Sequence, residues 1–449
     1  MSPLYYYTRK VGLLLLCLSL LNSCTKENNE LDNQLETTLA AASKGQGLSF
    51  FQLPANDDLA AIPQDPKNPI TKEKVILGKF LFHETGIAIN PKHPEGAKTY
   101  SCASCHHAKA GFQACRIQGV GEGGMGFGIS GESRVNNPDY LNLELDVQPL
   151  RTPSALNIAY QTNVLWNGQF GGTALNEGTE DQWTEETPKA VNHLGYEGTE
   201  IQAIAGLAVH RMAIKNSIAE MSNDYQGLFE TAFSDFPEAD RYSKETAGLA
   251  IAAYERTLLA NEAPFQEWLK GNTNALTDAQ KRGAVLFFGK AQCNACHTGA
   301  ALSSMAFYAL GMEDLQGFGV YGAEPQEGDK QGRGGFTKRP EDMYKFKVPQ
   351  LYNLKDSPFY GHGGTFRSVE EVVRYKNEAI PSKTSVPKSQ LADEFVPLGL
   401  SEQEIRDIAD FIENGLHDPN LHRYVPESLP SGNCFPNNDA VSKSDLGCG

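Results

Sequence analysis

The chain has 449 residues, with 39 Lys or Arg against 55 Asp or Glu, which gives a formal net charge of −16 at pH 7. This length is enough for two or three domains with cores of their own. The acidic balance argues against nucleic acid as a partner, because phosphate backbones bind basic surfaces. It is compatible with a basic or neutral protein partner.

The first 24 residues have the pattern of a lipoprotein signal peptide. Arg9 and Lys10 form a basic start, and the apolar run of residues 11–21 is too short to cross a bilayer comfortably. The following Leu-Asn-Ser-Cys has the form of a lipobox, so Cys24 is predicted to carry the lipid; an ordinary signal peptide with a chance cysteine is the alternative. The lipid would anchor an exported protein to a membrane surface, at the periplasmic face or elsewhere in the cell envelope.

Beyond the signal, residues 25–47 are polar and are predicted to form a flexible tether. Two Gly-rich stretches without periodicity, residues 113–140 and 317–340, predict long loops. Strand signals are sparse, so the fold is expected to be mostly α with small strand pairs at most. Apolar spacing and capping residues predict helices over residues 75–82, 200–214, 247–259, 278–288 and 401–414.

Two copies of Cys-x-x-Cys-His, at residues 102–106 and 293–297, give the strongest chemical signal in the chain. The pattern is typical of c-type haem attachment. The two thiols form thioethers with the haem vinyl groups, and the adjacent imidazole ligates the iron from one face. The sequence therefore predicts two covalent haems, attached through Cys102, Cys105, Cys293 and Cys296 and ligated by His106 and His297.

Other interpretations of these cysteines explain less. Two cysteine pairs could hold a structural zinc ion, but the pairs lie far apart in the sequence and each is followed at once by His. A thioredoxin-like redox pair explains neither the His nor the duplication. Export also agrees with haem, because bacteria attach c-type haem outside the cytoplasm.

The two halves of the chain resemble each other. Residues 77–82, before the first motif, match residues 282–287 before the second, and residues 153–157 match residues 349–353. A duplicated helical domain with one haem explains this repeat. The predicted units are an N-terminal haem domain (48–271), a C-terminal haem domain (272–430) and a tail (431–449) in which Cys434 and Cys448 could form a disulfide in an oxidising compartment.

From about Ile70 to Asn414 the chain resembles the bacterial di-haem cytochrome c peroxidases, a family that includes the methylamine-utilisation maturation enzymes. The resemblance implies two tandem cytochrome c-like domains, the first peroxidatic and the second for electron transfer. Besides both haem motifs, it rests on residues 77–82, 151–153, 165–168, 254–258, 347–349 and 400–401.

In that family, peroxide is reduced to water at the N-terminal haem, and electrons enter through the C-terminal haem from a cytochrome or similar donor. A Trp lies between the haems, and Trp166 matches it, which implies an electron relay; without the resemblance, a plain core aromatic is the better interpretation. A calcium ion between the domains and a homodimer are also typical of the family. The usual Asn of the calcium site is Arg151 here.

The first haem is expected to have an open or easily opened face. No His occurs between His107 and His193, where members that need reductive activation place a removable ligand. Met125 is the only soft ligand candidate in that Gly-rich loop, and it is more typical of a loop residue.

The resemblance also indicates which residues lie above the first haem. Gln202 matches the family's Gln, Gly206 stands where Pro is usual, and the usual Glu position falls at His210 or its neighbours. His210 is predicted to be the distal acid and base, since an imidazole exchanges protons near neutral pH. A structural His or a propionate contact is the alternative.

The second haem departs from the family pattern. Its usual ligand is Met, or Tyr in the maturation enzymes, but strict register places Lys376 at this position with Tyr375 beside it. Either residue would hold the iron at a lower potential than a thioether would. Tyr375 is the favoured ligand, and His362 matches a family His near the haems.

The sequence thus predicts a peroxidase with hydrogen peroxide as substrate. One alternative is a maturation-type oxidase that modifies a partner protein through a high-valent bis-haem state. Another is an electron-transfer cytochrome without catalysis, against which Gln202 at the peroxidase position argues.

Overall fold

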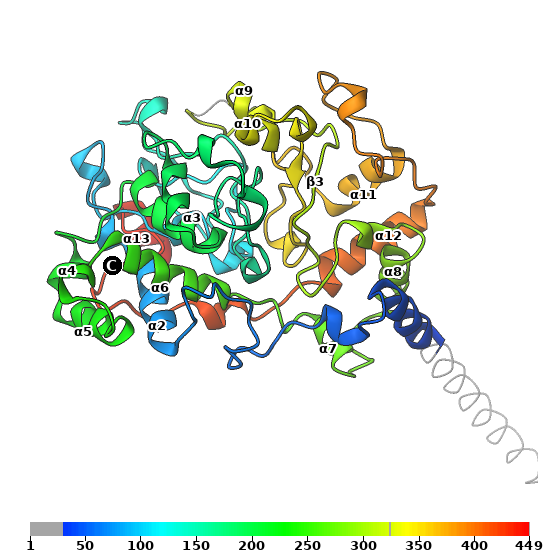
Figure 1. The fold of residues 1–449 in the computed structure, drawn as a ribbon, viewed down its shortest axis with the longest axis horizontal. Coiled ribbons are helices and arrows are strands. Elements are labelled where there is room, and N and C mark those ends of the chain that lie inside the picture. Colours follow the sequence, from blue (N-terminus) through cyan, green and yellow to red (C-terminus); the bar gives the residue numbers. More distant parts are fainter. Residues whose placement is uncertain (1–29, 323–324, 449) are drawn as a thin grey trace, which may run out of the picture.

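The computed structural model describes residues 30–322 and 325–448, so the predicted signal peptide and Cys24 lie outside the described residues. The described chain is mostly helical, with two antiparallel sheets of two strands each, which confirms the expected fold class (Figure 1). The helices are α2 (Lys72–His83), α3 (Gly198–Val209), α4 (Ile218–Met221), α5 (Asn223–Ala232), α6 (Lys244–Arg256), α7 (Pro264–Leu269), α8 (Asp278–Phe288), α9 (Glu327–Lys330), α10 (Arg333–Thr337), α11 (Val369–Glu378), α12 (Glu402–Asp410) and α13 (Ala440–Leu446), and the strands are β1 (Gly124–Met125), β2 (Val135–Asn136), β3 (Phe307–Tyr308) and β4 (Phe346–Lys347).

The helix starts follow the predicted caps. The Thr277 hydroxyl accepts a hydrogen bond from the backbone N–H of Gln280 at the start of α8. Ser401 caps α12 through the N–H of Glu404 in a capping box. Helix ends were harder to predict: α3 ends at Val209 and α6 at Arg256, a few residues before the expected ends.

In each half, a glycine lets the helix before the haem motif cross a second helix at close range. A Cβ at Gly78 of α2 would overlap the backbone oxygen of Ala250 in α6. A Cβ at Gly283 of α8 would likewise overlap the backbone oxygen of Asp407 in α12. The two glycines occupy matching positions of the sequence repeat, so the repeat corresponds to one helix crossing that occurs twice.

The described chain has two main hydrophobic cores. One is built around α2, α3, α5 and α6, and the other around α7, α8 and α12. Helix α7 belongs to the second core, so the expected boundary at residue 271 does not separate the two cores. The reason is that Phe265 and Trp268 pack against the second haem domain rather than the first.

The two ends of the chain cross over to the opposite halves (Figure 1). Residues 30–42 are helical, and Leu35 and Leu39 are buried in the second core, so the predicted flexible tether is wrong for this stretch. Leu421 and Tyr424, by contrast, are buried in the first core. The N-terminal stretch is polar overall, which is why it was predicted to be flexible. Its few apolar residues are spaced so that they form one buried face of the helix.

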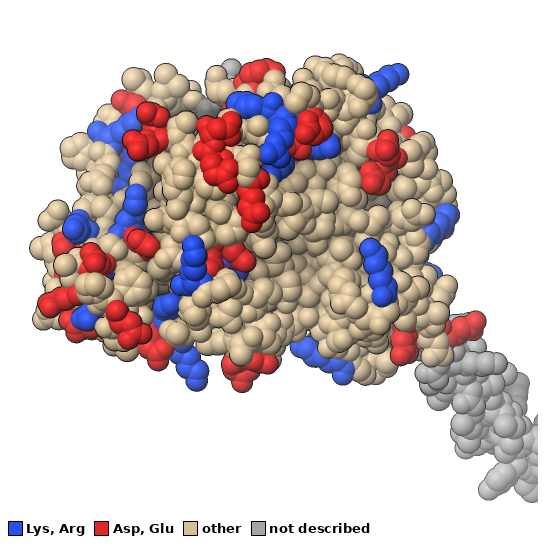
Figure 2. Space-filling view, viewed as in Figure 1, with Lys and Arg blue, Asp and Glu red and all other residues tan. Residues whose placement is uncertain are grey.

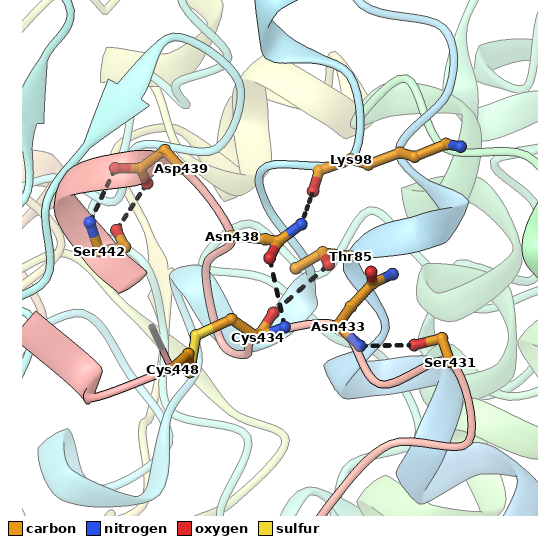
Figure 3. The surroundings of a disulfide bond; sticks show 9 residues. All are labelled: Thr85, Lys98, Ser431, Asn433, Cys434, Asn438, Asp439, Ser442 and Cys448. Carbon is orange, nitrogen blue, oxygen red and sulfur yellow. Dashed lines mark hydrogen bonds between the residues drawn. A yellow bond between two sulfur atoms is a disulfide. The ribbon is translucent and has the colours of Figure 1, made fainter. Parts of the chain in front are cut away.

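The C-terminal residues are part of the packed structure. Cys434 and Cys448 form a disulfide, and the Asn438 side chain joins the backbone N–H of Cys434 to the carbonyl of Lys98 (Figure 3). Helix α13 lies beside β1, where the Asp445 carboxylate accepts from the N–H of Phe127 at 2.8 Å. The segment therefore closes over the N-terminal half.

The surface carries Lys, Arg, Asp and Glu side chains of both signs, interspersed on the face shown in Figure 2. No helix in the described part of the chain is both long and apolar enough to cross a membrane.

Candidate functional site

One continuous cavity of about 800 Å³ runs through the interior and connects the two Cys-x-x-Cys-His motifs. The cysteines and the His of both motifs line it, and all six side chains are half-buried because they face this space. The cavity belongs to both halves of the chain. It is lined by Cys102, Cys105 and His106 from one motif and by Cys293, Cys296 and His297 from the other.

The local fold prepares both histidines to bind a metal. The Nδ1 of His106 donates to the backbone oxygen of Phe112 at 3.2 Å, and the Nδ1 of His297 donates to that of Leu302 at 3.1 Å. This leaves Nε2 as the basic nitrogen of each ring. Burial lowers the pKa of both imidazoles to about 4, which favours the neutral, metal-binding form.

These residues fit haem c. Each motif forms a short 3₁₀ turn with both thiols free and a neutral imidazole beside a largely apolar space. Zinc fits less well, because the described residues contain no cluster of three or more His, Cys, Asp or Glu that could hold a metal ion. The same finding leaves the expected calcium ion without a carboxylate cluster to bind it.

The two motifs differ in their exposure. Ala103 and Ser104, within the first motif, are buried, and the Ser104 hydroxyl donates to the backbone oxygen of Pro436 at 3.1 Å. Within the second motif, Ala295 is exposed, as is the preceding Gln292. The C-terminal segment therefore covers the first motif, whereas part of the second motif is exposed to solvent.

Helix α3 brings three of the residues singled out in the sequence to the cavity. Gln202, Gly206 and His210 are spaced by four residues and all line it. The Nδ1 of His210 lies 2.9 Å from a carboxylate oxygen of the buried Asp146. Burial acts to lower the pKa of His210, but the charge and hydrogen bond of Asp146 outweigh it, so the pKa is raised.

Trp166 lies at the interface of the two halves and lines the cavity. Its Nε1 donates to the backbone oxygen of Arg151 at 2.7 Å, and its own carbonyl accepts from the N–H of Lys347 at 2.8 Å. The indole also makes an edge contact with the ring of His362, with centroids 6.3 Å apart. Residues from both halves thus hold Trp166 in place.

At the second motif the structure separates the two candidate ligands. Lys376 lines the cavity, and burial lowers the pKa of its amine to about 8. Tyr375 does not line the cavity, and its hydroxyl donates to the backbone oxygen of Leu310 at 2.6 Å. The two side chains point to different places because neighbouring helical residues point in directions about 100° apart, and the position of Tyr375 favours Lys376 over it as the ligand of the second iron.

Arg151, at the family's calcium position, is buried between the two halves. Its guanidinium donates to Gln113 Oε1 and to the Ser357 hydroxyl, at 2.8 and 2.7 Å. It also donates to the backbone oxygen of Arg116 at 2.8 Å. A fixed cation surrounded by oxygen atoms already joins the domains here.

Several cavity residues were not assigned a role by the sequence. Asp146 is distant in sequence from His210, and nothing in its local pattern indicates a partner. Glu255 and Lys347 lie in stretches that match the family, but the sequence did not indicate a function for either side chain. Met125 and His107, which lie near the first motif in sequence, do not line the cavity. The thioethers that do line it belong to Met212 and Met312.

Comparison with known proteins agrees with this arrangement. Residues 72–274 match the family model described as di-haem cytochrome c peroxidase. Over 422 residues the chain is 30% identical to cytochrome-c peroxidase IdrP1 of Pseudomonas sp. strain SCT, covering 88% of this chain and 95% of the relative. It is 27% identical over 362 residues to methylamine utilization protein MauG of Methylorubrum extorquens, covering 80% and 82%.

The fold is also similar to that of a solved MauG-like protein associated with microbial copper homeostasis. The TM-score is 0.56 at 23% identity, with 82% of this chain and 95% of that chain covered. The likeness to IdrP1 extends over most of both chains. The chain therefore belongs to the di-haem cytochrome c peroxidase family.

Proposed function

We propose that this protein reduces hydrogen peroxide to water at the N-terminal haem site. Electrons enter through the C-terminal haem site from a cytochrome or another small redox protein. Haem is attached covalently at both motifs, and the protein is exported and held at a membrane surface by a lipid on Cys24. The observation that carries the direction of electron flow is the unequal exposure of the two motifs.

A covered first site favours chemistry, and an exposed second site favours exchange of electrons with a partner. Ser104 is buried beneath the C-terminal segment, which limits access of a protein donor to that haem edge. Ala295 and Gln292 are exposed, so a donor can approach the second haem edge closely. A protein donor needs such an exposed edge, whereas peroxide is small enough to diffuse into the cavity.

The protein side chains near the first motif supply the protons. Reduction of one peroxide to two waters consumes two electrons and two protons. Haem, when bound, supplies the redox chemistry. His210 holds a proton at Nε2 while Asp146 fixes its Nδ1, and Gln202 can orient the substrate by hydrogen bonding.

The residues between the two motifs provide the connection for electrons. The indole of Trp166 donates to the Arg151 carbonyl, its backbone carbonyl accepts from the N–H of Lys347, and its ring contacts His362. At the second site, Lys376 would ligate the iron through its amine and so exclude outside ligands; its position in the cavity lining and the lowered pKa of its amine support this role. An amine ligand would keep this haem at a lower potential than a thioether would.

The second candidate is a maturation-type oxidase that acts on a partner protein. The 27% identity to MauG over four-fifths of this chain favours it. However, the phenol of Tyr375 is directed to the backbone oxygen of Leu310 instead of the cavity, which weakens the analogy with a Tyr-ligated second haem.

The decisive experiment is stopped-flow mixing of the purified two-haem protein with hydrogen peroxide, with and without reduced cytochrome c. Continued oxidation of cytochrome c in proportion to peroxide supports the peroxidase. A slow-decaying oxidised form that does not turn over with cytochrome c would point to the maturation-type oxidase. No reaction with peroxide would leave only an electron-transfer protein. A pyridine haemochrome assay should first give two haems per chain.

A further inference from the structure

Two buried cations of the central cavity have no carboxylate partner. Lys347 is 6% exposed, and its Nζ donates only to the amide oxygen of Gln161, at 2.6 Å. Arg151 is 2% exposed, and all its side-chain acceptors are neutral oxygens. No ion pair involves either residue within the described chain. Both side chains line the cavity.

Two other buried cations of the described chain have acidic partners, whereas the buried Arg333 donates only to neutral oxygens. Arg256 binds the Glu200 carboxylate at 2.6 Å, and Lys281 binds that of Asp32 at 2.8 Å. A buried charge without a counter-charge is strongly destabilising. Accordingly, burial lowers the pKa of Lys347 to about 7 and that of Arg151 to about 9. An anion bound in the cavity would compensate these two charges, and no carboxylate of the described chain does so.

We infer that Lys347 and Arg151 bind carboxylates of the two haems, the propionates. The inference rests on the proposed occupation of the cavity by haem. Each haem c carries two propionates across the ring from the carbons that bond to cysteine. With the cysteines at the two motifs, the propionates would lie in the cavity between them, which Lys347 and Arg151 line.

Both residues also hydrogen bond to Trp166 through their backbones, which connects this charge pairing to the proposed electron relay. Lys347 donates its backbone N–H to the Trp166 carbonyl, and the Arg151 carbonyl accepts from the indole. Two uncompensated positive charges would oppose oxidation of this indole. Propionates bound to them would remove that opposition.

The test compares the haem midpoint potentials of the Lys347→Met, Lys347→Arg and wild-type holoproteins by spectroelectrochemistry. Removing a cation next to a haem stabilises its oxidised state, so Lys347→Met should lower one midpoint potential. A tenfold change in the reduction equilibrium is expected, which is about 59 mV for a one-electron couple. Lys347→Arg should retain the wild-type potential. Lys281→Met, which removes an equally buried but acid-paired lysine, should leave both potentials unchanged.

A second readout is the set of propionate bending bands in the resonance Raman spectrum, which do not depend on activity. They should shift in Lys347→Arg and in Lys347→Met, so the inference stays testable if Lys347→Met binds haem poorly. Unchanged bands in both variants, together with an unchanged potential in Lys347→Met, would overturn it. A titration with sodium acetate tests whether the anion comes from solution instead of from haem. If acetate changes the wild-type midpoint potential in a saturable way, and this change requires Lys347, then the propionate assignment is wrong. The potentials can be measured in a protein that does not turn over peroxide, so failure of this inference is distinguishable from failure of the proposed peroxidase.

Discussion

The Nδ1 of His210 lies 2.9 Å from a carboxylate oxygen of Asp146, a residue 64 positions earlier in the chain. The carboxylate is buried, while the imidazole reaches the cavity near the first haem motif. This pairing fixes one ring nitrogen and leaves the other available for proton exchange, which is the arrangement expected of a general acid and base held by a carboxylate.

The first prediction tests this pair. His210→Ala should lower kcat/KM for hydrogen peroxide by about 100-fold or more, because it removes the proton donor and acceptor. Asp146→Asn should cause a smaller loss, since the ring stays but loses its orientation. His193→Ala, which changes an exposed imidazole outside the cavity, is the control and should behave like the wild type. Full peroxide reactivity of His210→Ala would show that another group moves the protons.

The second prediction concerns the ligand of the second iron. Lys376→Met should raise the midpoint potential of the C-terminal haem, because a thioether favours reduced iron more than an amine does. Absorption spectra should then show a sulfur-to-iron charge-transfer band that is missing from the wild type. Tyr375→Phe should leave both haem spectra unchanged, because the phenol is bound to the Leu310 carbonyl. If the wild type already has the sulfur band, Met312 is the ligand and the Lys376 assignment is wrong.

The third prediction concerns the helix crossing in the second haem domain. Gly283→Ala should destabilise the protein by about 1–3 kcal/mol, because the added Cβ would overlap the backbone oxygen of Asp407. Urea unfolding followed by circular dichroism measures the change. Gly227→Ala in α5 is the matched control, since a Cβ there meets nothing within 4 Å, and helix propensity predicts a gain of up to about 1 kcal/mol. Equal stability of the two variants would contradict the close crossing.

The fourth prediction is a dependence of stability on pH that comes from His83. This imidazole is buried, its Nδ1 donates to the Lys79 carbonyl at 2.8 Å, and burial lowers its pKa from 6.5 to about 4. Between these values the unfolded chain binds the proton and the folded chain does not. The free energy of unfolding contributed by His83 is therefore complete above pH 6.5 and is lost as the pH falls toward 4.

Urea unfolding of the wild type and of His83→Gln at pH 7.5 and pH 5 checks this contribution. The wild type should lose about 2 kcal/mol more than the variant between these two values. Gln has no titrating group but can still donate to the Lys79 carbonyl. An identical pH dependence in the two proteins would show that His83 is not buried as a neutral ring.

The sequence by itself determined the features that depend on neighbouring residues. Both haem motifs, the capping of α8 by Thr277 and of α12 by Ser401, and the internal repeat could all be recognised because their chemistry lies within a few consecutive positions. The mostly helical fold followed from apolar spacing in the same way. Gly78 and Gly283 were part of the repeat, although the reason for glycine there is a helix crossing that the sequence does not reveal.

Tertiary structure decided which side chains share a space. Tyr375 and Lys376 are adjacent in the sequence, and only the packing of α11 determines that the lysine faces the cavity. Asp146 and His210 come from distant segments, so their pairing depends on how a loop folds over α3. The packing of each chain end against the opposite half was likewise not predictable. The sequence around a leucine such as Leu35 does not indicate which core will bury it. Motifs and helix caps can be predicted because their residues are close in the sequence. Contacts between distant segments cannot, because they depend on the packing of the whole chain.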